Sequence, residues 1–92
     1  MAVLLVTYDL KGSTRDYAPL HEAIKKDAIA WWHYLESVWL VNTTEGADAL
    51  AKRLYPHITR DDRLLVIRVT NEYQGWLAKD AWDWLNSQGW SW

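Results

Sequence analysis

Residues 31–41 read WWHYLESVWLV, and this stretch decides the fold of the chain. Its aromatic and β-branched side chains favour extended strands, and the Glu36-Ser37 pair near its middle suits a tight turn. The pattern therefore predicts two antiparallel strands, over residues 30–35 and 37–43, that are joined as a hairpin.

Alternation along a strand divides the side chains of this hairpin between two faces. We expect Trp31, His33 and Leu35 on one face, and Trp32 and Tyr34 on the other. One set should pack under helices. The other should lie on the opposite surface of the sheet, either in a subunit contact or as a wall on which a flat ring stacks.

Further elements flank the hairpin. The apolar run AVLLVTY at residues 2–8 predicts a buried strand, and LLVIRVT at residues 64–70 predicts the last strand. Helical spacing of apolar residues predicts helices over residues 17–28, from about residue 44 to residue 55, and over residues 76–86. The expected caps and stops of these helices are Asp16, Thr43 or Thr44, Pro56 and Gly89.

The order of these elements predicts an α+β fold, the ferredoxin-like βαββαβ sandwich, with an added C-terminal helix. Residues 1–72 should form the sandwich, and residues 73–92 a tryptophan-rich helical extension packed on the same domain. Two helices on one face of the sheet leave the other face uncovered. A second copy of the chain could bury this uncovered face, so we expect a symmetric homodimer.

Composition narrows the class of protein. The chain has 92 residues, no cysteine and a formal net charge of −2. Its apolar run at residues 1–8 is far shorter than the roughly 20 residues that span a bilayer. We expect a cytoplasmic protein without a membrane partner, and the acidic balance argues against an extended DNA-binding surface.

Three motifs resemble those of the CRISPR-associated protein two family. They are VTYDL at residues 6–10, YLESVWLV at residues 34–41 and TRDDRLLVIRV at residues 59–69. The chain is still more similar to the stand-alone, SinR-like relatives of that family, and more distantly to VapD-like ribonucleases. The resemblance spans roughly residues 2–70. It implies a ferredoxin-like fold and a symmetric dimer in which Asp9 lies near its symmetry mate and helps to hold a divalent metal.

Members of that family either cut nucleic acid or act as a structural bridge on DNA. This chain departs from the pattern because only Lys11 and Arg15 follow Asp9 where family members carry a dense basic run. It also ends in a tryptophan-bearing helix and is acidic overall. These departures argue against a DNA-bridging role.

Asp9 is the candidate catalytic and metal-binding residue. Two copies across a twofold axis could hold Mg²⁺ or Mn²⁺ and activate a water molecule. The alternative is a turn aspartate that accepts backbone hydrogen bonds. The three histidines are scattered, and none is spaced four residues from another, so they do not indicate a metal site.

Eight tryptophans in 92 residues exceed what a small core needs. Aromatic side chains that stay outside the core would stack on a base, and nearby cations would hold phosphate groups. The candidate ligand-binding residues are Tyr8, Asp9, Lys11, Arg15, Trp31, Trp32, His33, Tyr34, Trp39, Arg68 and Trp76.

Three functions follow from these patterns. We expect a noncatalytic dimeric binding protein for a nucleotide-type ligand that needs no cofactor. By extension, it would be a phage or mobile-element protein that sequesters a nucleotide immune signal. The second function is a metal-dependent endonuclease that uses Asp9 at the dimer axis, with Mg²⁺ or Mn²⁺ as its cofactor. The third is a structural or toxin–antitoxin-type interaction protein.

Overall fold

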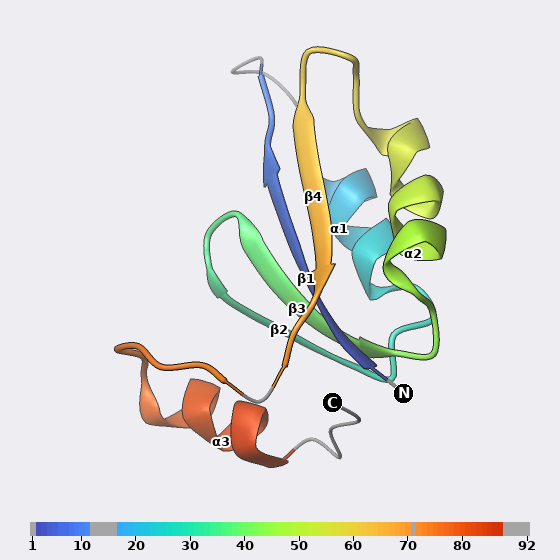
Figure 1. The fold of residues 1–92 in the computed structure, drawn as a ribbon. Helices are drawn as coiled ribbons and strands as arrows, with labels where there is room; N and C mark the ends of the chain where they lie inside the picture. The colour runs from blue at the N-terminus through green and yellow to red at the C-terminus, as the bar shows by residue number, and fades with distance from the viewer. Residues whose placement is uncertain (1, 12–16, 71, 88–92) are drawn as a thin grey trace.

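The computed structural model describes residues 2–11, 17–70 and 72–87. Four strands and three α-helices follow along these residues in the order β1, α1, β2, β3, α2, β4, α3 (Figure 1). Their bounds are β1 Ala2–Asp9, α1 Ala18–Lys25, β2 Ala30–Leu35, β3 Val38–Thr43, α2 Ala47–Leu54, β4 Arg63–Arg68 and α3 Lys79–Ser87, with a 3-10 turn, η1, at Tyr55–His57. The predicted α+β class is confirmed. None of the described helices has the length and apolar character to cross a membrane.

The four strands form one antiparallel sheet in the order β2-β3-β1-β4. β1 is central and pairs on both sides: Leu5 lies opposite Leu40 of β3 and opposite Ile67 of β4. Because facing residues of paired strands share a face, these three side chains lie on one surface of the sheet. Tyr8 and Trp39 lie on the other.

Helices α1 and α2 cover that second surface, which we call the helix face (Figure 1). Its buried residues make a single cluster: Leu4, Val6, Tyr8, Leu20, Ala23, Ile24, Trp39, Val41, Leu50 and Leu54. The helical spacing of Leu20, Ala23 and Ile24 supplies the contribution of α1. The main core therefore lies between the sheet and these two helices.

Helix α3 lies on the opposite surface of the sheet, beside β2 and β3. Ala81 and Leu85 of α3 pack against Trp32, and the Trp32 Nε1–H donates to the carbonyl oxygen of Ala81 at 3.3 Å. The expectation that this surface has no cover from its own chain was therefore wrong for the half next to β2 and β3. Trp32 is part of a second small core, because α3 buries it to 3% exposure.

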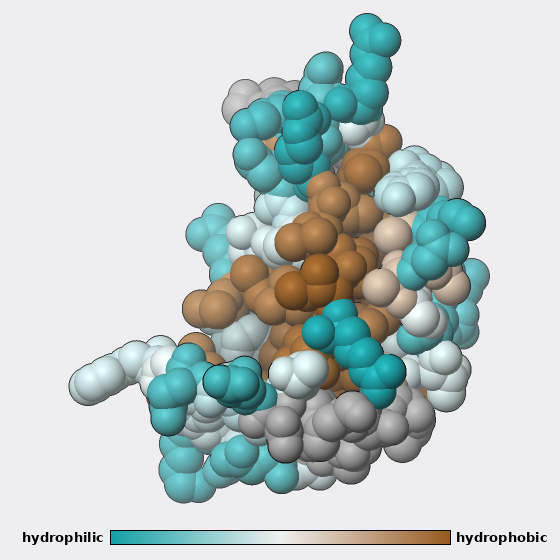
Figure 2. All heavy atoms as spheres, viewed as in Figure 1, coloured by the Kyte–Doolittle hydropathy of each residue, from teal (hydrophilic) through white to brown (hydrophobic). Residues whose placement is uncertain are grey.

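The part of this surface that α3 leaves uncovered is apolar and open, from Leu35 at the end of β2 to Leu65 and Ile67 of β4, and we call it the open band. Figure 2 shows apolar side chains gathered along the middle of this view. Leu35, Leu65 and Ile67 are exposed by 47%, 52% and 45%. Leu35 was expected on the same face as Trp31 and His33, but an irregularity in the β2–β3 register between Trp32 and Leu35 reverses it. Leu35 instead lies opposite Val38.

Arg53 of α2 stabilises the C-terminal end of α1. Asp27, just past the helix, has a positive φ of 63°, a conformation that aspartate tolerates better than most residues. The Arg53 guanidinium donates to the carbonyl oxygens of Ala23 and Lys26 and forms two hydrogen bonds with the Glu45 carboxylate, at 2.8 and 3.1 Å. One side chain thus satisfies terminal helix carbonyls and pairs with an acid.

Several expected helix limits differ from the structure. α1 ends at Lys25 and not at residue 28, and α3 starts at Lys79 and not at residue 76. Neither threonine caps α2. Its N-cap is Gly46, and the Thr43 hydroxyl instead accepts from the Glu45 backbone N–H at 3.1 Å. The expected caps Asp16 and Gly89 lie outside the described residues.

Replacing Arg53 tests the link between α1 and α2. We expect Arg53→Lys to lower the free energy of unfolding by about 1–3 kcal/mol, since an ammonium group cannot reach both carbonyls and the carboxylate together. Urea denaturation followed by circular dichroism measures this. The control is Lys52→Ala, which removes a Lys52–Asp48 pair whose side chains are 68% and 83% exposed and should change stability by less than about 0.5 kcal/mol. Equal, small effects of the two changes would contradict the role given to Arg53.

Candidate functional site

A pocket of about 320 Å³ opens on the helix face where β1 ends. Three parts of the chain meet there: the end of β1, the start of α1 and the turn between β2 and β3. The lining residues are Tyr8, Asp9, Leu10, Tyr17, His21, His33, Glu36 and Ser37. Its size lies at the lower end of the range for small-molecule sites in proteins.

Trp39 lies beneath this pocket and is only 2% exposed. The His33 ring stacks on its indole, with ring centroids 3.9 Å apart and planes 8° apart. The His21 ring also contacts Trp39, with centroids at 5.1 Å, and meets His33 at 5.5 Å. Trp39 therefore supports the two histidines and does not itself face a ligand.

A hydrogen-bond chain joins the core to the pocket. The Trp39 Nε1–H donates to the Tyr8 hydroxyl at 3.3 Å, and the same hydroxyl lies 2.8 Å from His21 Nε2. Because the indole can only donate, the simplest arrangement has the Tyr8 O–H donate to His21 Nε2. His21 is then the neutral tautomer with its proton on Nδ1.

His33 is held by its other nitrogen. Its Nδ1 lies 2.9 Å from the carbonyl oxygen of Val38, and since a carbonyl only accepts, Nδ1 carries a proton. This hydrogen bond holds one edge of the His33 ring, and the stacking on Trp39 holds one of its faces, so the two contacts fix the orientation of the ring. In the neutral form of His33, Nε2 remains as a hydrogen-bond acceptor.

Burial shifts the titration of both members of the Tyr8–His21 pair. Burial lowers the pKa of His21, and the nearby His33 and Lys25 lower it further. Burial also raises the pKa of Tyr8, against a smaller opposing effect of the hydrogen bond from Trp39. Both shifts favour the neutral pair at physiological pH.

The rim of the pocket is acidic. Asp9 and Glu36 are among its lining residues, and Lys11 Nζ lies 2.8 Å from Asp9 Oδ2. The side chains of this ion pair are 60% and 65% exposed, so water screens their attraction. Within the described part of the chain, no three histidine or acidic side chains come together as a metal-binding group. A metal at Asp9 stays a prediction.

Asp62 anchors the segment that carries Asp9 and Lys11. It is 5% exposed, and one carboxylate oxygen accepts from the Lys11 backbone N–H at 2.8 Å. The other oxygen accepts from the Thr59 backbone N–H at 2.8 Å and from its hydroxyl at 3.2 Å. The turn before β4 therefore positions the rim of the pocket through one buried carboxylate.

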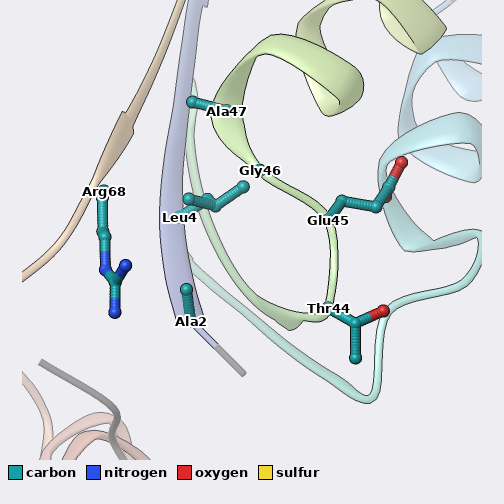
Figure 3. Close-up of a pocket in the computed structure, with 7 residues that line it drawn as sticks. All are labelled: Ala2, Leu4, Thr44, Glu45, Gly46, Ala47 and Arg68. Atoms are coloured by element: carbon teal, nitrogen blue, oxygen red, sulfur yellow. The ribbon is translucent and has the colours of Figure 1, made fainter.

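Arg68 belongs to a different pocket, of about 390 Å³, at the start of α2 (Figure 3). Figure 3 shows Arg68 and Glu45 on opposite sides of β1, with Leu4 between Arg68 and the helix. Ala2 lines this pocket and Tyr8 lines the first, so the two lie near opposite ends of β1. Arg68 lies opposite Leu4, four residues or about 13 Å along β1 from Tyr8, and it does not line the first pocket.

The remaining predicted residues are dispersed. Trp31 is 45% exposed beside Trp39, with Lys25 Nζ 5.1 Å from the centroid of its ring. Tyr34 and Trp32 lie with α3, where the Tyr34 hydroxyl donates to Asp80 at 3.0 Å. Trp76 is 99% exposed in the segment before α3. Arg15 lies outside the described residues.

Of the eleven predicted ligand residues, the structure brings Tyr8, Asp9 and His33 into the lining of one pocket, with Trp39 beneath them. Sequence reasoning missed His21, Tyr17 and Glu36. Tyr17 and His21 are four residues apart and therefore share a helix face, a signal that was available in the sequence. The position of Glu36 depends on how the hairpin turn lies against α1.

Comparisons with protein-family models, with curated proteins and with solved structures find no match to this chain.

The pKa of His21 tests the description of the pocket. We expect an NMR titration to place it below the ordinary value of 6.5. Because the folded state binds this proton less readily than the unfolded chain, the free energy of unfolding should fall as pH drops from 6.5 towards the folded pKa.

Lys25→Gln should move the pKa of His21 part of the way back up, because the charge of Lys25 is one of its smaller causes. Lys52→Gln, on an exposed position of α2, is the matched control and should leave the titration unchanged. A His21 that titrates at or above 6.5 would contradict the buried, neutral Tyr8–His21 pair.

Proposed function

We propose that the chain is a noncatalytic, homodimeric binding protein of the ferredoxin-like class for a nucleotide-type ligand. We further propose that the ring of that ligand occupies the pocket between α1 and the β2–β3 turn. The observation that carries this proposal is the stack of His33 on buried Trp39 within a pocket of about 320 Å³.

The ring faces available to a ligand belong to Tyr17, His21 and His33. Tyr17 is 40% exposed, and its centroid lies 6.0 Å from that of His21. These rings are held by packing and hydrogen bonds before any ligand arrives, so little conformational entropy is lost on binding. A base that stacks on such a surface gains about 1–3 kcal/mol.

The polar groups of the pocket suit binding more than turnover. His21 is engaged by Tyr8, and His33 by the Val38 carbonyl, so each imidazole already uses one nitrogen. Lys11 lies beside Asp9 at the rim, where a phosphate outside the pocket could meet it. Sequestering a nucleotide signal, as a phage or mobile-element protein would, needs no more chemistry than this.

Binding of nucleotides tests the proposal. We expect isothermal titration calorimetry with AMP, GMP, CMP, UMP and cyclic dinucleotides to detect at least one ligand. We also expect His33→Ala to weaken the binding of that ligand by about 1–3 kcal/mol, because the ring on which the base would stack is lost. His57→Ala is the control, since His57 does not line the pocket. The absence of heat with every nucleotide would overturn the proposed function.

The dimer rests on a separate observation, the open band. Leu65 and Ile67 present exposed apolar side chains on an edge strand, and Leu35 lies on the same surface of the sheet. Burying such a surface against a second copy is favourable by about 25 cal/mol per Å² of apolar area. This observation also supports the runner-up function, an interaction protein in which this surface takes a different partner.

Changing the open band tests the dimer. We expect the unaltered chain to sediment as a dimer at micromolar concentration, and Ile67→Lys to sediment as a folded monomer, because the added charge cannot be buried. Ala49→Lys, on an exposed position of α2, should leave the dimer intact. Monomeric sedimentation of the unaltered chain at high concentration would contradict the dimer.

A further inference from the structure

Asp9, Glu36 and His33 are lining side chains that offer hydrogen-bond acceptors to a ligand. The carboxylates of Asp9 and Glu36 only accept when ionised, and a neutral His33 offers Nε2 as an acceptor because its Nδ1 is bonded to Val38. The lone pair of His21 is already taken by the Tyr8 hydroxyl. Glu36 and His33 can therefore take hydrogen-bond donors from a ligand, whereas His21 offers its Nδ1–H as a donor and one Asp9 oxygen already accepts from Lys11.

The charge of the lining points in the same direction. Glu36 carries a negative charge, the charge of Asp9 is paired with Lys11 at 2.8 Å, and burial lowers the pKa of His21, which favours its neutral form. A phosphate placed beside Glu36 would face a like charge, whereas an amino group there would meet complementary oxygens. The rings of Tyr17, His21 and His33 supply flat apolar faces beside those oxygens.

We propose that the pocket takes the base end of its ligand and selects bases that carry an exocyclic amino group, with the amino edge towards the Glu36 carboxylate. The phosphate then stays outside, on the side of Lys11. This inference rests on the proposed function and adds to it the orientation and the class of base. Adenine, cytosine and guanine present such an edge, whereas uracil and hypoxanthine do not.

Matched pairs of nucleosides test the selection without any phosphate. Adenosine is compared with inosine, and cytidine with uridine, by isothermal titration calorimetry on the full chain. The amino-bearing member of each pair should bind about tenfold more tightly. Equal affinities within both pairs would overturn the selection while leaving nucleotide binding in place. Failure of every nucleoside and nucleotide to bind would overturn the proposed function with it.

Glu36→Gln tests the residue that makes the selection. Glu36 is exposed at a turn, so the change should not disturb folding, which circular dichroism verifies. Because a carboxamide both donates and accepts, the preference within each pair should fall to about twofold or less. Glu22→Gln, on α1 outside the lining, should keep the full preference. A tenfold preference that survives Glu36→Gln would show that the amino edge does not face Glu36.

Discussion

The indole N–H of Trp39 is the constraint on which the pocket depends. Trp39 is almost wholly buried, and an indole N–H without a partner in the core would cost several kcal/mol. The Tyr8 hydroxyl is its partner, and accepting that bond leaves the Tyr8 proton to point at His21. The same hydrogen bonds therefore fix both the packing of Trp39 in the core and the orientation of Tyr8 and His21 in the pocket. The pocket is preorganised, because moving the Tyr8 hydroxyl away would leave the buried indole N–H of Trp39 without its acceptor.

Helix α3 changes what the sheet can offer. By covering Trp32 it turns one of the expected stacking residues into core, and it reduces the open surface of the sheet to the band that includes Leu65 and Ile67. The two faces of the sheet therefore differ in chemical character. The helix face holds the polar, aromatic pocket, and the opposite face offers apolar contact area. A ligand and a second subunit need not compete for the same surface.

The sequence predicted the elements well because their signals are local. Alternation in WWHYLESVWLV correctly separated Trp31 and His33 from Trp32. It failed at Leu35, since a register irregularity depends on how two strands pair and not on the composition of either. Thr43 and Thr44 were reasonable caps by type, yet Gly46 occupies the position because the chain reaches α2 later than expected.

The site was harder to predict than the fold. Tyr8, Asp9, His33 and Trp39 were selected from the hairpin and the end of the first strand, and they do come together. Arg68 was grouped with them, but strand length separates it, since it lies opposite Leu4 near the start of β1. His21 was passed over because a lone histidine beside an apolar helix stripe carries little information before its partner Tyr8 is known.

The most direct measurement is the indole ¹H–¹⁵N spectrum of the labelled protein during titration with AMP. Tryptophan-to-phenylalanine variants assign the signals. If a ring binds over His33, the Trp39 Nε1–H signal should shift, because its hydrogen bond to Tyr8 and its stack with His33 lie directly beneath the ligand. The signal of Trp76, which is 99% exposed and does not line the pocket, should stay in place. A saturating shift of Trp76 with an unchanged Trp39 would contradict the account.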